Sequence, residues 1–252
     1  IEYYRQSPID KVIIALPHHA EERLLAILQR LKQLPVEISL APDLVGFRLP
    51  AASGAELAGL RMTAMAHRPL RASERFFKEI FDRSLAALLL LLLSPLLLAI
   101  ALAVKLTSPG PVFFRQERYG LGNRTFNVLK YRSMRVEQQD LGGARQTRRN
   151  DARVTAIGTL LRRTSLDELP QLINVLRGDM SMVGPRPLPV QMRVEDRLNY
   201  EIVAEYAHRH RVKPGITGWA QVKGHRGAIE TAEGLQSRVA YDLYYIEHWS
   251  LW

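Results

Sequence analysis

The chain has 252 residues and a formal net charge of +10, from 35 lysines and arginines against 25 acidic residues, and it has no cysteine. The absence of cysteine excludes disulfide bonds and thiolate metal sites. The excess of positive charge predicts an anionic partner: nucleic acid, acidic lipid or a phosphorylated substrate.

The first 45 residues carry the pattern of a β-α-β unit. Residues 12–16 form a short apolar, β-branched run typical of a buried strand, and residues 36–40 alternate like a second strand. Between them, residues 20–34 have apolar positions at helical spacing. No glycine-rich phosphate loop follows the first strand, so nucleotide binding is not supported here. We therefore expect residues 1–45 to be the C-terminal part of a Rossmann-like α/β domain, a regulatory or structural remnant at the start of an excised fragment.

A linker and a basic helix are predicted next. Residues 46–70 contain many Ala, Gly and Pro residues without a firm period, which predicts a linker. Residues 70–83 place Phe76, Phe77 and Phe81 among basic residues. This pattern is typical of an amphipathic helix in the headgroup region of a membrane. A solvent-exposed helix packed on its own domain is the alternative.

Residues 84–104 form an uncharged run of 21 residues, eleven of them leucine. A straight helix of that length would be roughly 30 Å long, the thickness of a bilayer core. Ser94 and Pro95 divide the run into halves that are each too short to cross, because a proline inside a helix removes a hydrogen bond and kinks the helix. The run is then either a kinked span or a hairpin that enters one leaflet and returns.

The charges around this run favour the re-entrant hairpin. Lysine and arginine gather on the cytoplasmic side of membrane segments, and here they flank the run at both ends. Both ends are therefore expected on the cytoplasmic face. A buried core helix of a soluble protein is the remaining alternative, although eleven leucines leave no polar face.

Short strands and a polar loop are predicted after the run. Residues 112–116 and 125–132 are expected to form two strands around a turn at Gly120 and Gly122. Residues 136–153, rich in Gln, Arg, Asp and Gly, predict a polar loop.

An acidic pair, Asp167 and Glu168, precedes a predicted helix that ends at Gly178. Pro170 belongs in the first turn of that helix, so the two carboxylates lie at its N-terminus, where the helix dipole favours negative charge. Ser165 and Glu168 have the spacing of a capping box, and this structural interpretation competes with a catalytic one.

Neighbouring cations favour catalysis. Arg162 lies just upstream of the pair, and Arg186 is held between Pro185 and Pro187 on a stiff, non-helical segment. Adjacent carboxylates with several arginines resemble a phosphoryl-transfer site, in which acids hold Mg²⁺ and cations neutralise phosphates. Lys213 could also meet phosphate, while Trp219 could stack on a base, lie at a membrane interface or pack in the core.

Several long motifs occur in an order that resembles a known family, the bacterial sugar transferases. These are monotopic polyprenyl-phosphate phosphoglycosyltransferases that start exopolysaccharide and O-antigen repeat units. The resemblance covers roughly residues 76–252, and the motifs occupy residues 109–116, 130–134, 165–172, 174–181, 183–187 and 213–221, after the run broken at Ser94 and Pro95. Two departures are Tyr131, where phenylalanine is usual, and residues 222–226, which replace the usual asparagine before glycine.

The resemblance implies a fold class and a location. We expect an α+β catalytic domain over residues 71–252, mainly helical with short strands. Its re-entrant helix hairpin, broken at Ser94 and Pro95, would lie in the inner leaflet of the bacterial cytoplasmic membrane among phospholipids. The catalytic domain would face the cytoplasm, with self-association left open.

The resemblance also implies a reaction and its residues. Asp167 would attack the β-phosphate of a UDP-sugar, giving a phosphosugar-aspartate and UMP, and polyprenyl (undecaprenyl) phosphate would then accept the phosphosugar. Asp167 and Glu168 would be the catalytic residues and would bind Mg²⁺. The expected substrate-binding residues are Lys130, Arg132, Arg162, Arg186 and Lys213. Neither the sugar, with glucose or galactose as guesses, nor the polysaccharide pathway follows from the sequence.

Two other classes compete with this enzyme. A membrane-tethered basic binding or regulatory module would need the positive charge but not the acidic pair. Nucleic-acid binding would explain the charge, but the cations are scattered and the leucine run would have no role in it.

Overall fold

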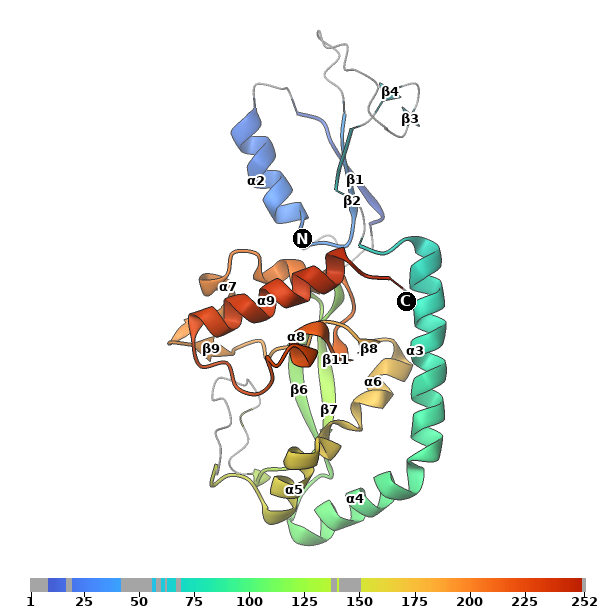
Figure 1. Cartoon of the computed structure of the whole chain (residues 1–252), viewed down its shortest axis with the longest axis vertical. Helices are drawn as coiled ribbons and strands as arrows, with labels where there is room; N and C mark the ends of the chain where they lie inside the picture. Colours follow the sequence, from blue (N-terminus) through green and yellow to red (C-terminus); the bar gives the residue numbers. More distant parts are fainter. Residues whose placement is uncertain are drawn as a thin grey trace.

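The computed structural model shows a mixed helical and stranded body with a small α/β unit at one end, a long helix along one side and a second helix that turns beneath the body (Figure 1). The residues that the structure describes are 9–16, 20–41, 56–57, 60–61, 63–66, 69–136, 140 and 151–250. Most of the predicted linker and of the polar loop over 136–153 lies outside them.

The N-terminal unit contains the predicted β-α-β order. Strand β1 (Lys11–Ile14) pairs in parallel with β2 (Glu37–Leu40), and α2 (Glu21–Leu31) connects them. The buried residues Ile14, Val36 and Ile38 form its core with the apolar stripe of α2, as the periodicity predicts.

The predicted linker is not wholly a linker. Strand β5 (Thr63–Ala66) pairs antiparallel with β2, and β3 (Glu56–Leu57) pairs with β4 (Leu60–Arg61). The sequence of β5 has no strong strand pattern of its own. The segment is a strand because its backbone pairs with β2.

Two consecutive helices contain the apolar run. Helix α3 (Ala72–Leu92) joins the predicted amphipathic helix to the first half of the run, and α4 (Ser94–Thr107) contains the second half. Pro95 lies in the first turn of α4, where its missing N–H costs nothing. The Ser94 hydroxyl donates to the Leu91 carbonyl over 2.8 Å. The helices meet at a bend of 66°, which confirms the predicted break at Ser94 and Pro95.

By length and composition, no single helix among the described residues can cross a bilayer, whereas the bent α3–α4 pair passes the same test when taken together. One face of this pair is apolar and exposed: Phe76, Phe81, Leu91, Leu98 and Leu106 each leave more than 60% of their surface uncovered. The opposite face buries Ala86, Ile100 and Val104 against the body. A core helix of a soluble protein would bury both faces, so the exposed face weakens that alternative.

The body is built on the predicted hairpin. Strand β6 (Phe113–Tyr119) pairs antiparallel along its whole length with β7 (Thr125–Tyr131), around a turn at η1 (Leu121–Asn123). Helix α6 (Gln171–Arg177) lies between β7 and α3, and Gly178 ends it in the left-handed conformation, as the sequence predicts. Leu172, Val175 and Met180 pack there on Ala86 and Val128.

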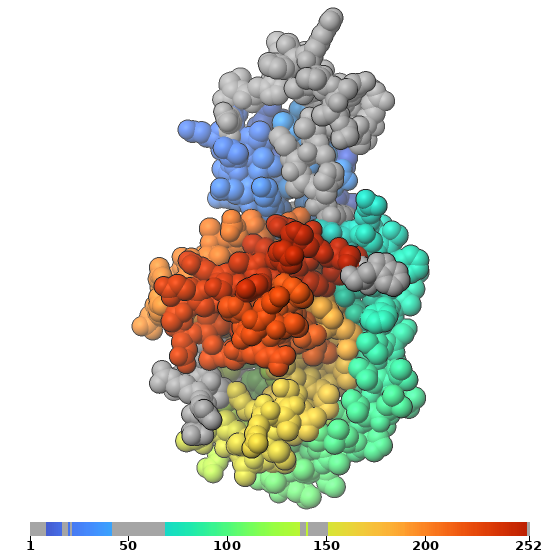
Figure 2. Space-filling view, in the orientation of Figure 1, coloured from blue at the N-terminus to red at the C-terminus, as the bar shows by residue number. Residues whose placement is uncertain are grey.

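The remaining elements surround this centre. Helix α5 packs on α4 below the body, and α9 crosses the front face above α8 (Figures 1 and 2). Strands β8 and β11 pair in parallel, and β9 and β10 form a short antiparallel pair. Their bounds are α5 (Ala156–Thr164), η3 (Leu166–Glu168), β8 (Ser181–Val183), β9 (Arg193–Val194), β10 (Arg197–Leu198), α7 (Asn199–Ile202), η4 (Tyr206–Arg211), β11 (Gly215–Thr217), α8 (Trp219–Val222) and α9 (Ala232–Glu247).

Candidate active site

The acidic pair lies in a tight turn between two helices. Ser165 ends α5 in the left-handed conformation, with φ at 59°, and η3 then carries Asp167 and Glu168 to the start of α6. The Ser165 side chain makes no capping hydrogen bond. The capping-box interpretation is therefore wrong, and the side chain of Glu168 is committed elsewhere.

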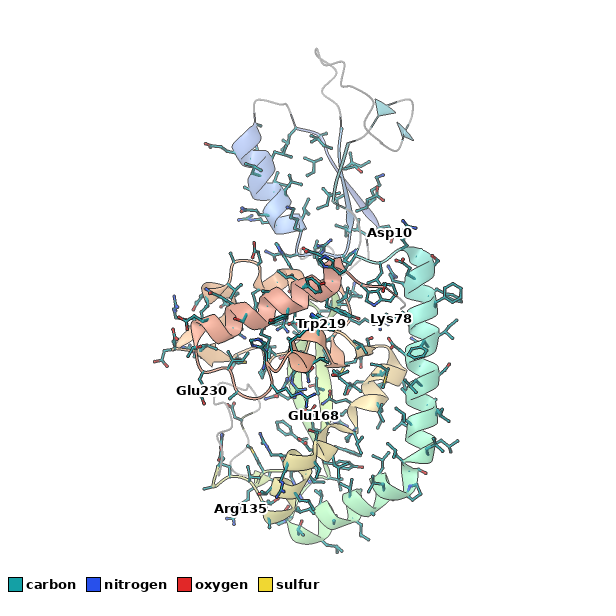
Figure 3. All side chains as sticks on the ribbon, in the orientation of Figure 1. Asp10, Lys78, Arg135, Glu168, Trp219 and Glu230 are labelled. Atoms are coloured by element: carbon teal, nitrogen blue, oxygen red, sulfur yellow. The ribbon has the colours of Figure 1, made fainter. Side chains whose placement is uncertain are left out.

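Glu168, labelled in Figure 3, forms ion pairs with Lys130 and Arg186. Lys130, on β7, donates to Oε1 over 2.7 Å. The guanidinium of Arg186 forms a fork with the same carboxylate, with Nη1 3.0 Å from Oε2 and Nη2 on Oε1. Burial alone would raise the pKa of Glu168, but Lys130 and Arg186 outweigh it and hold that pKa far below its ordinary value. The carboxylate form of Glu168 is thus favoured, and it holds two cations in place.

Asp167 has a contrasting environment. Its side chain is buried, and no group in the described part of the chain donates a hydrogen bond to its carboxylate. Burial raises its pKa, and the nearby charge of Lys130 is the strongest opposing influence, with smaller ones from Arg162 and Arg186. A desolvated carboxylate without hydrogen bonds, beside held cations, has the properties of a nucleophile toward phosphorus.

Arg186 is supported from behind by a buried ion pair that the sequence analysis missed. Arg209, on η4, donates to the Arg186 carbonyl over 2.7 Å and also pairs with Asp242 on α9. Both members of the pair are only 1% exposed. The signal in the sequence was that Asp242 shares a helical stripe with apolar residues of α9, including Leu235 and Val239, and a charge in such a stripe needs a buried partner.

Arg118 completes the support of this segment. It lies on β6, donates to the Pro187 carbonyl and also donates to Gln116 over 2.6 Å. Burial, together with Arg186, lowers the pKa of Arg118 to about 9. The Pro-Arg-Pro segment is therefore stiffened by its two prolines and by two arginines that donate to its carbonyls.

The structure places the predicted substrate-binding residues in three different environments. Lys130 and Arg186 lie at the acidic pair, and Arg162, exposed on α5, is close enough to influence the charge of Asp167. Lys213 does not join them. Its ammonium pairs with Glu79 on α3 at 3.3 Å, beyond the far end of α6.

Arg132 has a structural contact in place of the predicted substrate contact. It is 1% exposed, and its guanidinium donates to the carbonyls of Ser108 and Pro109, each over 2.6 Å, and to that of Val104 over 3.3 Å. The last carbonyls of a helix have no partner within the helix, and Arg132 satisfies them at the end of α4. These contacts give Arg132 a structural role, and its predicted contact with substrate stays a prediction.

Trp219 lies on α8, partly buried, rather than in the core. Its ring stacks on Tyr244 of α9, with centroids 6.2 Å apart, and the Lys223 ammonium lies 4.7 Å from its centre. Packing of Trp219 in the core is therefore not supported, and stacking on a base and a position at a membrane interface remain the two alternatives.

The acidic pair fits a magnesium ion through one residue more readily than through two. The described residues contain no group of three or more metal-binding side chains, and both oxygens of Glu168 accept from cations. Magnesium commonly uses one or two carboxylates together with substrate phosphates. Asp167 fits such a role, whereas Glu168 would first have to release a cation.

Comparisons with known proteins match two families. Residues 73–252 match the family described as bacterial sugar transferase, and residues 1–42 match one described as a CoA-binding domain. The chain is 46% identical over 249 residues to an undecaprenyl-phosphate glucose phosphotransferase of Komagataeibacter xylinus, covering 98% of this chain and 47% of that protein.

Two further relatives are UDP-glucose:undecaprenyl-phosphate glucose-1-phosphate transferases. The one from Xanthomonas campestris pv. campestris is 44% identical over 255 residues, with 100% of this chain and 52% of that protein covered. The one from Escherichia coli (strain K12) is 44% identical over 252 residues, with 100% and 53% covered. The chain spans about half the length of these relatives. With most of its length matched, the chain belongs to the bacterial sugar transferase family.

Proposed function

We propose that this chain transfers a sugar phosphate from a UDP-sugar to polyprenyl (undecaprenyl) phosphate and releases UMP. The observation that carries the proposal is Asp167, a buried carboxylate without hydrogen-bond donors among the described residues, beside the Lys130–Glu168–Arg186 cluster. The names of the relatives support undecaprenyl phosphate as the acceptor and make UDP-glucose the proposed donor.

The reaction divides into two displacements at one phosphorus atom. An oxygen of the Asp167 carboxylate attacks the β-phosphorus of the UDP-sugar, the bond to the oxygen shared with the α-phosphate breaks, and UMP leaves. An oxygen of polyprenyl phosphate then attacks the same phosphorus, the bond to Asp167 breaks, and the carboxylate is restored. Covalent catalysis of this kind lets a soluble donor and a lipid acceptor react in turn.

The cations supply the electrostatic part of catalysis. The phosphate oxygens gain negative charge as the nucleophile approaches, and Lys130 and Arg186 are already fixed in place by Glu168. Exposed Arg162 lies where it can meet the remaining phosphate. Magnesium, when bound by Asp167 and the diphosphate oxygens, would add further charge neutralisation.

The exposed apolar face of α3 and α4 supports a membrane location. In this proposal the bent pair enters the inner leaflet of the cytoplasmic membrane among its phospholipids, and the body lies on the cytoplasmic face. Asp167 and Glu168 would then lie close to the membrane surface, within reach of the phosphate of a lipid. The step would be the first in the assembly of a polysaccharide repeat unit.

An exchange assay tests the covalent intermediate directly. Membranes containing the protein are given UDP-glucose and labelled UMP without lipid acceptor, and label is expected to enter UDP-glucose. Asp167→Asn should abolish both this exchange and turnover with polyprenyl phosphate, whereas the exposed control Asp196→Asn should retain both. Turnover without exchange would indicate direct transfer. Full biological function of an inactive Asp167→Asn protein would instead indicate a binding or regulatory module.

A further inference from the structure

A cavity of about 460 Å³ lies between α3, the β8–β11 strand pair and the N-terminal unit. Its wall includes Lys78, Gly178 and Lys213, together with Ile9 and Asp10 from the N-terminal unit. Asp167 and Glu168 do not line it. In Figure 3, Lys78 lies on the upper part of α3 and Asp10 lies near the top of that helix, both away from Glu168.

Helix α6 separates this cavity from the acidic pair. The pair precedes the first residue of α6, and Gly178, in the cavity wall, follows its last residue. A helix of seven residues is about 10 Å long. The cavity is therefore a second place on the same body, with its own set of charges.

Two cations from distant parts of the sequence converge in this cavity. Arg83 of α3 and Lys213, just before β11, both contact Oε1 of Glu79, at 2.6 Å and 3.3 Å. Gly178 lies directly beneath them: a Cβ atom there would be 2.8 Å from Arg83 Nη2 and 3.6 Å from Lys213 Nζ. The carboxylate of Glu79 thus bridges Arg83 and Lys213. Gly178 has no side chain and so leaves room for both cations.

The cavity wall carries more positive than negative charge. Six basic residues line it against four acidic ones, the basic ones being Arg75, Lys78, Arg83, Arg124, Arg211 and Lys213. Among the acidic residues, Asp82 is engaged by Ser181, Lys78 and the Met182 amide. Glu79 is 40% exposed and is the acidic group between Arg83 and Lys213.

A purely structural role does not account for this arrangement. Cations near the end of α6 stabilise its dipole, but that effect does not explain a cavity of several hundred cubic ångströms beside them. The wall also has apolar residues, including Leu70, Phe126 and Met180. A pocket in which apolar residues lie beside convergent charged groups is typical of a ligand site.

We propose that this cavity is a second anion site, which takes a phosphate ester with its phosphate between Arg83 and Lys213 and its organic part against the apolar wall. Glu79 occupies the phosphate position in the absence of ligand and moves toward solvent when the ligand binds. The ester comes either from a lipid headgroup or from a soluble phosphate. The outward face of this part of α3 carries exposed Phe76 and Phe81, which favours the lipid.

Inorganic phosphate and vesicles serve as probes, with the full chain in detergent for the first. Phosphate is expected to raise the Tm of the parent protein and of Arg186→Met, whose altered cation is at the acidic pair. Lys213→Met and Arg83→Met should bind phosphate at least about tenfold more weakly, because each loses one charge–phosphate contact worth roughly that factor. Exposed Lys32→Met is the matched control with unchanged binding.

A variant that is expected to strengthen phosphate binding distinguishes specific binding from damage to the fold. Glu79→Gln removes the competing carboxylate, so phosphate should bind several-fold more tightly. Glu117→Gln, at an exposed position on β6, adds the same net charge elsewhere and should leave binding unchanged. Equal tightening in both variants would mean that only net charge matters and would overturn the proposal.

The vesicle experiment distinguishes the two sources of phosphate. Parent and Lys213→Met proteins are sedimented with phosphatidylcholine vesicles that do or do not contain phosphatidylglycerol. A preference for phosphatidylglycerol that Lys213→Met loses assigns the site to a lipid headgroup, and phosphate binding without that preference assigns it to a soluble ester. Phosphate binding lost in Arg186→Met but kept in Lys213→Met would place the anion at the acidic pair and refute the second site. None of these results depends on turnover at Asp167.

Discussion

Asp167 and Glu168 are adjacent in the chain, yet their carboxyl groups have opposite chemistry. The pKa of Glu168 is lowered because two cations contact it, whereas burial raises the pKa of Asp167, which has no hydrogen-bond donor among the described residues. In the proposed reaction, one carboxylate organises the cations and its neighbour keeps its lone pairs for the attack on phosphorus. The sequence predicts the pair but cannot divide these roles, because the division depends on contacts with Lys130 and Arg186.

The pH dependence of the proposed transfer should follow from the titration of Asp167 and Lys130. The rate should fall at low pH as Asp167 is protonated, at a higher pH than for an exposed aspartate because its pKa is raised. It should also fall above about pH 8, because burial lowers the pKa of Lys130 to about 8 and the site then loses a cation. A bell-shaped profile of kcat/KM measures both limbs.

Lys130→Met should change this profile in a defined direction. Lys130 is the strongest influence that lowers the pKa of Asp167, so its loss moves the acid limb to higher pH and removes the alkaline limb. The maximal rate should fall by about 100-fold, as for the loss of one stabilising donor. The control is Lys32→Met, at an exposed position on the N-terminal unit. An unchanged acid limb in Lys130→Met would show that Lys130 does not act on Asp167.

We expect Arg132 to act on stability rather than on substrate binding. Arg132→Met removes three hydrogen bonds to carbonyls near the end of α4, one of them buried and two partly buried, and we expect a loss of about 2 to 3 kcal/mol in the free energy of unfolding. The KM for the UDP-sugar should not change in protein that remains folded. Exposed Arg163→Met, on α5, should alter stability by less than about 0.5 kcal/mol. A raised KM with normal thermal unfolding would restore the substrate role.

At the scale of elements, local pattern was sufficient for much of the fold. The spacing of apolar residues predicts α2, α6 and the β6–β7 hairpin, and Pro95 and Gly178 mark two helix boundaries. These features depend on residues that are close in the sequence.

Contacts between distant residues were not predictable in the same way. Strand β5 is defined by its pairing with β2, and the Arg209–Asp242 pair joins residues 33 positions apart. Lys213 resembled a site residue because cations suit phosphate, but the folding of β8 against β11 directs it to another cavity. Such placements depend on tertiary structure, which no local period encodes.

Asp82 shows how α3 is attached to the body. Its carboxylate accepts from the Ser181 hydroxyl at 2.7 Å and from the Met182 amide at 3.2 Å, and it pairs with Lys78. Asp82→Ala removes the acceptor of Lys78 and of the Met182 amide, while the Ser181 hydroxyl retains the Val183 carbonyl, and the loss should cost about 3 kcal/mol in unfolding free energy. Turnover should also fall in folded protein, because β8 leads directly to the Arg186 segment.

Thermal unfolding and turnover measure these two effects. Exposed Glu117→Gln is the control and should alter neither. A stable Asp82→Ala protein with full turnover would show that this attachment does not position the site.

For the whole molecule, the absence of cysteine permits a direct test of the re-entrant arrangement. Single cysteines introduced by Ser73→Cys and Ser108→Cys lie at the two ends of the bent helix pair, and both are expected to react with a membrane-impermeant reagent from the cytoplasmic side only. Ser165→Cys, in the body, reports the same side as a reference. Labelling of the Ser73→Cys and Ser108→Cys proteins from opposite sides would mean that the pair spans the membrane.

The continuity of α3 has a mechanical consequence. One unbroken helix carries the exposed phenylalanines, the Asp82 attachment and the first half of the leucine run. If the lower half of α3 lies in lipid as proposed, this rigid helix sets the height of the proposed transfer site above the hydrocarbon core of the membrane. The length of the lipid acyl chains would then change the tilt of α3 and how readily a polyprenyl phosphate reaches Asp167. The thickness of the bilayer would thus change the rate without a contact to any residue of the site.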